Sequence, residues 1–173
     1  MITIIVTTHR KNSFTAKMAE LVKTRLQIRG QAASVLDLRL LPGDFMWKKI
    51  EGEEHPEFDY LIEEHIRDVH KLIFVIPEYN GSFPGMVKTF IDAVPPRFFY
   101  TKKAALIGIA SGRAGALRAL DDMTGVLHYL QVEVLSDKPK FPCIDKILND
   151  SGSLSDPDAS VRLDKCIDKF LAF

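Results

Sequence analysis

The sequence predicts an α/β protein in which helices cover both faces of a doubly wound parallel sheet, giving three layers. Its apolar runs are continuous rather than alternating, which is typical of parallel strands buried on both faces. Segments with helical periodicity separate these runs, and strands that alternate with helices build this architecture. The runs cover residues 2–6, 33–38, 71–76 and 104–110, with a weaker fifth run at 132–135.

The first predicted helix carries apolar residues from Phe14 to Leu26, and Gly30 is well placed to end it. Further apolar stripes predict helices over 58–69, 86–94, 117–127 and 163–171. Five strands favour the flavodoxin-like order 2-1-3-4-5, and a chain of 173 residues is expected to form one domain, 1–173. Ligands of such sheets bind outside the carboxyl ends of the strands, so the loops at 7–13, 77–85 and 111–115 form the candidate site.

The composition excludes several classes of partner. The 23 basic and 23 acidic residues balance, which gives no electrostatic reason to expect nucleic acid or an anionic membrane as partner. Cys143 and Cys166 have neither CxxC spacing nor a nearby histidine pair, so no metal site and no disulfide framework is predicted. The apolar start is too short for a signal segment, and no later run has the length of a membrane span. We therefore expect a cytoplasmic protein.

The loop after the first strand offers groups that bind a phosphate monoester. Thr8, Ser13 and Thr15 provide hydroxyls, Arg10 provides a bidentate cation, and the following helix provides free amides at its N-terminus. Ser13 is also a preferred N-cap, a role compatible with phosphate binding because both use the same helix end. The alternative for Arg10 is a solvated side chain. Neither GxGxxG nor GxxxxGK[ST] is present, which argues against the nucleotide sites that use these motifs.

The loop after the third strand contains two glycines and two prolines, which predict a rigid, tight turn. Tyr79 offers a flat surface for a ring, Asn80 and Ser82 offer polar contacts, and Gly81 lets the backbone approach a ligand. Glu78 is expected to orient the loop. The residues alone leave open whether this loop is a ligand site or a structural turn.

The stretch 77–92, which begins at Pro77, resembles the signature of the NAD(P)H-dependent FMN reductase family, which includes flavodoxin-like quinone, chromate and azo-dye reductases. The first loop is similar to the family's phosphate loop Gly-Ser-x-Arg-x-x-Ser. Arg10 and Ser13 match it, and Thr8 stands at the serine position. Thr7 stands at the glycine position and is a departure: if that position needs a positive φ, a β-branched residue is costly there and FMN binding suffers.

The resemblance implies an FMN protein that passes hydride from NADPH or NADH to a small electron acceptor such as a quinone, free flavin or metal oxyanion. The flavin carries the chemistry, so no catalytic side chain is expected. The second loop is implied to present main-chain N–H groups to the N5 and O4 edge of the flavin, with Ser111, Gly112 and Gly115 of the third loop beside the ring. Arg113 is expected to stabilise reduced flavin or a dinucleotide phosphate, or else to be solvated. Family members typically assemble as dimers, which implies a homodimer or a dimer of dimers.

Two alternatives remain. An electron-carrier flavodoxin would bind FMN without oxidising NAD(P)H, but the neutral charge and the missing Gly-Asn element argue against it. A flavin-free binding or regulatory relative is supported by Thr7. Outside the loops, Trp47 is predicted to be a core or subunit contact, and Lys88 and Asp92 are predicted to pair on one helix face.

Overall fold

The computed structural model describes residues 1–173 and contains a six-stranded parallel sheet. The strand order is β2-β1-β3-β4-β5, which confirms the predicted arrangement, and β6 pairs with the same edge of β4 as β5 does. The strands are β1 (Ile2–Val6), β2 (Ala33–Asp37), β3 (Lys71–Pro77), β4 (Lys103–Ile109), β5 (Glu133–Val134) and β6 (Lys140–Phe141).

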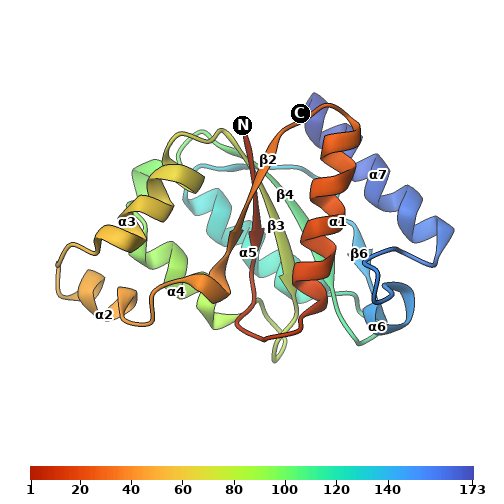
Figure 1. Cartoon of the computed structure of the whole chain (residues 1–173), viewed down its shortest axis with the longest axis horizontal. Helices are drawn as coiled ribbons and strands as arrows, with labels where there is room; N and C mark the ends of the chain where they lie inside the picture. The colour runs from red at the N-terminus through yellow and green to blue at the C-terminus, as the bar shows by residue number, and fades with distance from the viewer.

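Helices cover both faces of the sheet (Figure 1). One face packs against α1 (Phe14–Ile28), α6 (Ile144–Ile147) and α7 (Pro157–Ala172). The other face packs against α2 (Phe45–Ile50), α3 (Pro56–Ile62), α4 (Gly85–Ala93) and α5 (Leu117–Tyr129). Short 3-10 turns occupy Leu38–Leu40 and Pro96–Phe98, and a π-helical turn, Glu63–Arg67, continues α3. No helix combines the length and the apolar character that crossing a membrane requires.

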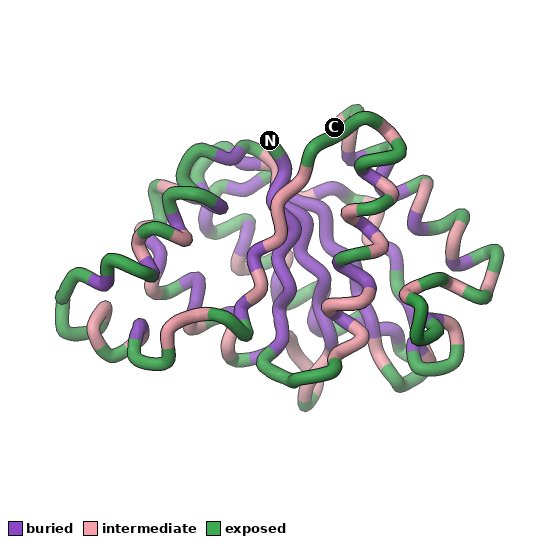
Figure 2. Tube along the Cα trace, in the orientation of Figure 1, coloured by how far each residue is buried: buried purple, intermediate pink, exposed green.

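The central strands are buried on both faces, which explains why their apolar runs do not alternate. In β1, Ile4 and Val6 belong to the core under α1 and α7, whereas Ile5 belongs to the core under α3, α4 and α5. Figure 2 shows this buried centre between two more exposed helical layers. The loops at the carboxyl ends of the strands lie outside the two cores and are free to carry function.

The predicted fifth strand at 132–135 is confirmed as the shorter β5, and a second short strand that was not predicted, β6, pairs with the same edge of β4. Glu133 and Val134 of β5 pair with the start of β4, whereas Lys140 and Phe141 of β6 pair with its end. The segment 135–139 separates them, although the Leu135 N–H still donates to the Ala104 carbonyl and the Pro139 carbonyl still accepts from the Gly108 N–H. The sequence pattern missed β6 because a two-residue strand carries no periodicity.

Two short helices, α2 and α6, were also not predicted. In α2, Phe45 stacks on Phe58 of α3 with ring centroids 4.8 Å apart, so Phe45 is a core residue. Trp47 of the same helix remains 64% exposed. The predicted Lys88–Asp92 pair on α4 is confirmed at 2.7 Å. Gly30 has a φ of +70° and ends α1 as predicted, with the Gln31 N–H donating to the Leu26 carbonyl.

Candidate functional site

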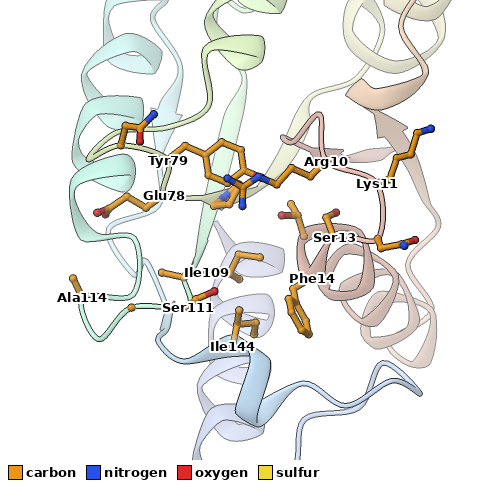
Figure 3. A pocket seen from close by; sticks show the side chains of 16 residues that line it. Arg10, Lys11, Ser13, Phe14, Glu78, Tyr79, Ile109, Ser111, Ala114 and Ile144 are labelled. Carbon is orange, nitrogen blue, oxygen red and sulfur yellow. The ribbon is translucent and has the colours of Figure 1, made fainter.

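A cavity of about 520 Å³ lies at the carboxyl ends of β1, β3 and β4 (Figure 3). This is the edge at which doubly wound sheets bind ligands. All three predicted loops contribute to its walls. The lining residues are Arg10, Lys11, Asn12, Ser13, Phe14, Thr15, Pro77, Glu78, Tyr79, Asn80, Ile109, Ala110, Ser111, Gly112, Ala114 and Ile144.

The N-terminus of α1 forms one end of this cavity. Ser13 is the N-cap, and its Oγ accepts a hydrogen bond from the Ala16 N–H at 3.2 Å. Thr15 lies in the first turn, and Arg10 and Lys11 bring positive charge. The first turn of α1 holds no acidic residue, so the positive end of the helix dipole is not neutralised from within. An anion is therefore favoured here.

Thr7 does not need the conformational freedom of glycine. Its φ is not positive, and its buried hydroxyl donates to the Val75 carbonyl at 2.7 Å. The condition under which Thr7 would strain the loop is therefore not met. The left-handed residue of this loop is Asn12, with a φ of 44°, and asparagine tolerates that region.

Thr8 lies behind the cavity wall rather than on it. It is fully buried, its Oγ1 accepts a hydrogen bond from the Arg10 N–H at 3.1 Å, and it lies 2.6 Å from the Tyr79 hydroxyl. The hydroxyl therefore joins the first loop to the second. Of the hydroxyls predicted to face a phosphate, Ser13 and Thr15 line the cavity and Thr8 does not.

The second loop contains a tight hairpin turn. The Tyr79 N–H donates to the Ser82 carbonyl at 2.8 Å, and the Ser82 N–H donates to the Tyr79 carbonyl at 3.2 Å. Asn80 and Gly81, with φ of 52° and 85°, occupy the two central positions, as a type I′ turn requires. Gly81 and Ser82 do not line the cavity, and the Ser82 hydroxyl instead donates to Asp122 of α5.

The Tyr79 ring contacts the first loop on more than one side. The Arg10 guanidinium carbon lies 4.2 Å from the ring centroid. The His9 ring meets the Tyr79 ring edge-on, with centroids 5.6 Å apart. In Figure 3, Tyr79 and Arg10 lie together, whereas Ser111 and Ile144 lie in another part of the cavity.

The third loop divides into lining and supporting residues. Ser111, Gly112 and Ala114 line the cavity. Gly115 is buried, has a φ of +63°, and leaves too little room for a side chain, since a Cβ there would lie 2.9 Å from the Lys140 Cβ. Its requirement for glycine comes from its close approach to β6. Arg113 is exposed and does not line the cavity.

The walls away from α1 combine apolar surface with one carboxylate. Phe14, Ile109 and Ile144 supply the apolar surface. Glu78 is half-buried, and its Oε2 is fully shielded from solvent without a hydrogen-bonding partner in the protein. Such an atom is costly unless a ligand satisfies it.

Several lining residues were missed from the sequence. Phe14 lies in an apolar helix stripe and Ile109 in an apolar strand run, and neither pattern distinguishes a residue that lines a cavity from one in the core. Ile144 belongs to α6, which lies outside the three predicted loops. Lys11, Asn12 and Ala114 lie inside predicted loops, and their positions alone were the available signal.

Comparison with known proteins gives matches along the whole chain. A 2-hydroxy-1,4-benzoquinone reductase of Burkholderia sp is 25% identical over 177 residues, covering 99% of this chain and 94% of that protein. A quinone reductase of Pseudomonas putida is 26% identical over 160 residues, covering 90% and 84%. The solved structure of FerB, a flavoenzyme NAD(P)H:acceptor oxidoreductase from Paracoccus denitrificans, superposes with a TM-score of 0.82 at 24% identity over 99% of this chain and 94% of that one.

The family model for NADPH-dependent FMN reductases matches residues 1–141, which include all three loops around the cavity. The chain therefore belongs to the NADPH-dependent FMN reductase family.

Proposed function

We propose that this protein binds FMN in the cavity and uses NAD(P)H to reduce a small electron acceptor. The observation that carries the proposal is the division of the cavity into two chemically different parts. Hydroxyls, cations and a helix N-terminus gather at one end, and apolar side chains with exposed backbone loops form the rest. A phosphate monoester joined to a flat, largely apolar ring has the same division.

The residues present fit FMN. Ser13, Thr15 and Arg10 would hold the phosphate, using hydroxyl and guanidinium donors together with the dipole of α1. The backbone of the 77–80 segment and of Ser111 and Gly112 would border the ring. Phe14, Ile109 and Ile144 would shield it from water. FMN, when bound, supplies the hydride chemistry itself, so the protein's contribution is to bind, orient and partly desolvate.

A quinone is the acceptor best supported. The relative from Burkholderia sp, which matches almost the full length of this chain, is named a 2-hydroxy-1,4-benzoquinone reductase. A quinone is flat and compact enough to dock over a flavin ring in an open cavity. Free flavin and metal oxyanions are the other acceptors to compare.

The test begins with purified protein to which FMN is added and from which unbound FMN is then removed. Retained yellow absorbance that bleaches under anaerobic NADPH, and returns when a benzoquinone is added, is the expected result. Arg10→Ala is expected to weaken FMN retention. Arg113→Ala is the matched control, since it removes an exposed loop arginine that does not line the cavity.

The same experiment separates the two rivals. Protein that keeps FMN but does not bleach with NADPH behaves as an electron carrier. Protein that never retains FMN is a flavin-free relative, and the enzyme proposal then fails. The geometry of Thr7 removes the main argument for this second rival.

We further propose that residues 1–173 form one domain that works as a homodimer or dimer of dimers in the cytoplasm. A groove of about 840 Å³ between α4 and α5, partly lined by Phe83, Ile91 and Val126, supports association. Tyr129 lies on its rim and is 87% exposed. The two unpaired cysteines support a reducing compartment. Light scattering of the purified protein tests the oligomeric state, and a single-subunit mass would refute the dimer.

A further inference from the structure

We propose that Tyr79 is a positioning residue for phosphate recognition. It holds Arg10 and the first loop in place, so that the protein distinguishes FMN from riboflavin, which lacks the phosphate. This inference rests on the proposed function, because it assigns one residue a task inside the same cavity. It differs from the sequence-based expectation that the flat ring of Tyr79 serves the flavin ring.

The Tyr79 hydroxyl forms a hydrogen bond with a buried side chain of the first loop. The Tyr79 hydroxyl lies 2.6 Å from Thr8 Oγ1, and Thr8 Oγ1 also accepts a hydrogen bond from the Arg10 N–H at 3.1 Å. Thr8 is fully buried, so water does not compete strongly for these bonds. The hydroxyl of the second loop is therefore joined, through one oxygen, to the backbone from which the Arg10 side chain departs.

The Arg10 guanidinium also contacts the Tyr79 ring. The guanidinium carbon lies 4.2 Å from the ring centroid, well within cation–π distance. The Arg10 guanidinium donates no hydrogen bond to the protein, and the side chain is exposed. An exposed arginine otherwise samples many rotamers, so the ring limits this freedom while leaving the N–H donors available.

The backbone of Tyr79 is itself held in place by a tight turn. Its backbone N–H and carbonyl both pair with Ser82 across the Asn80–Gly81 turn. The ring is thus fixed by a tight turn at its backbone and by Thr8 at its hydroxyl. Because binding costs less when the donors are already in place, this arrangement favours a ligand that presents a phosphate to Arg10.

The Tyr79 side chain is in contact with the first loop rather than with the third. The guanidinium of Arg10 covers one part of the ring, His9 approaches another at 5.6 Å, and Thr8 engages the hydroxyl. All three partners belong to the first loop. Figure 3 likewise places Tyr79 beside Arg10 rather than beside Ser111.

The experiment compares the dissociation constants of FMN and riboflavin, measured by quenching of flavin fluorescence. The variants are Tyr79→Leu, Tyr79→Phe, Arg10→Ala and the double variant Arg10→Ala with Tyr79→Leu. We expect Tyr79→Leu to weaken FMN about tenfold, as loss of a cation–π contact and its anchor implies, and to leave riboflavin unchanged. Tyr79→Phe keeps the ring and is expected to lie between Tyr79→Leu and the unsubstituted protein. In the Arg10→Ala background, Tyr79→Leu is expected to add little, because the residue acts through Arg10.

Equal weakening of FMN and riboflavin would overturn the inference and make Tyr79 a ring contact. Full additivity of the two substitutions, or no change in FMN affinity, would also overturn it. Unchanged riboflavin binding shows that the variant is folded. If Tyr79→Leu does not fold, Tyr79→Met replaces it, since its unbranched side chain fills similar space without a ring or hydroxyl. Unsubstituted protein that binds neither flavin would refute the proposed function instead.

Discussion

Replacing Thr7 with glycine, the residue found at this position of the family's phosphate loop, tests whether glycine there would raise the stability of the protein or its affinity for FMN. Thr7 is fully buried, has no positive φ, and donates its hydroxyl to the Val75 carbonyl at 2.7 Å. Glycine would lose that bond, at about 1 kcal/mol, and a buried methyl group, at about 0.8 kcal/mol. Glycine would also raise the conformational entropy of the unfolded chain, which costs the folded state about 0.5–1 kcal/mol. We expect the free energy of unfolding to fall by roughly 2–3 kcal/mol, with no gain in FMN affinity.

Urea unfolding of FMN-free protein measures the stability, and flavin fluorescence measures the affinity. Thr7→Val is the matched control, because it keeps the β-branched shape and loses only the hydroxyl, at about 1 kcal/mol. Two results would refute the reasoning. One is Thr7→Gly protein as stable as the unsubstituted protein, and the other is tighter FMN binding by Thr7→Gly, which would show that the bound loop needs a positive φ.

Three further predictions concern stability. Gly115→Ala is expected to destabilise the protein by roughly 2 kcal/mol or more, because its Cβ would lie 2.9 Å from a side-chain atom of β6 at a φ of +63°. Gly112→Ala, whose Cβ meets nothing within 4 Å, should melt at the unchanged temperature, and equal melting of both would contradict this account. Burial raises the pKa of the Cys166 thiol to about 12, so it should react with a thiol reagent at pH 8 only after unfolding. Because this pKa lies above the ordinary 9.0, the thiol's contribution to stability is present below pH 9.0 and is lost as the pH rises toward 12, and Cys166→Ala should remove that loss. The hydrogen bond from His55 lowers the pKa of Asp44 from 3.8 to about 2, so its stabilising effect is present above pH 3.8 and is lost as the pH falls toward 2. Acid unfolding of Asp44→Asn should lack that part of the pH dependence, and an unchanged acid curve would count against the pair.

The sequence was sufficient for the main strands because β1, β3 and β4 are apolar and buried on both faces, and the half-buried edge strand β2 still carries an apolar run. It was insufficient for β6 and α6, which are too short for any periodicity and owe their conformation to neighbours distant in sequence. Phe45 shows the same limit, because α2 is fixed by stacking on Phe58 rather than by its own pattern. Local preference decides long elements, and tertiary contact decides short ones.

The candidate site followed the same division. The loops were located correctly because a doubly wound sheet places them at one edge, and Ser13 was predicted as the N-cap that it is. The residue types in the loops do not show which glycine is required by close packing, so the tight contact between Gly115 and β6 could be found only from the structure. Nor did it reveal that the hydroxyl of Tyr79 reaches back to Thr8, since those residues lie 71 positions apart.

The split between β5 and β6 determines what the sheet edge beyond β4 exposes. A sheet edge with a continuous row of free N–H and C=O groups is a template on which another chain can add a strand, and such growth leads to fibres. Beyond β4 the edge offers only two residues in β5 and two in β6, separated by a segment that contains Lys138 and Pro139. Proline cannot donate to a ladder, and lysine discourages stacking of like edges. The edge beyond β4 is therefore a poor template for the addition of a strand from another chain.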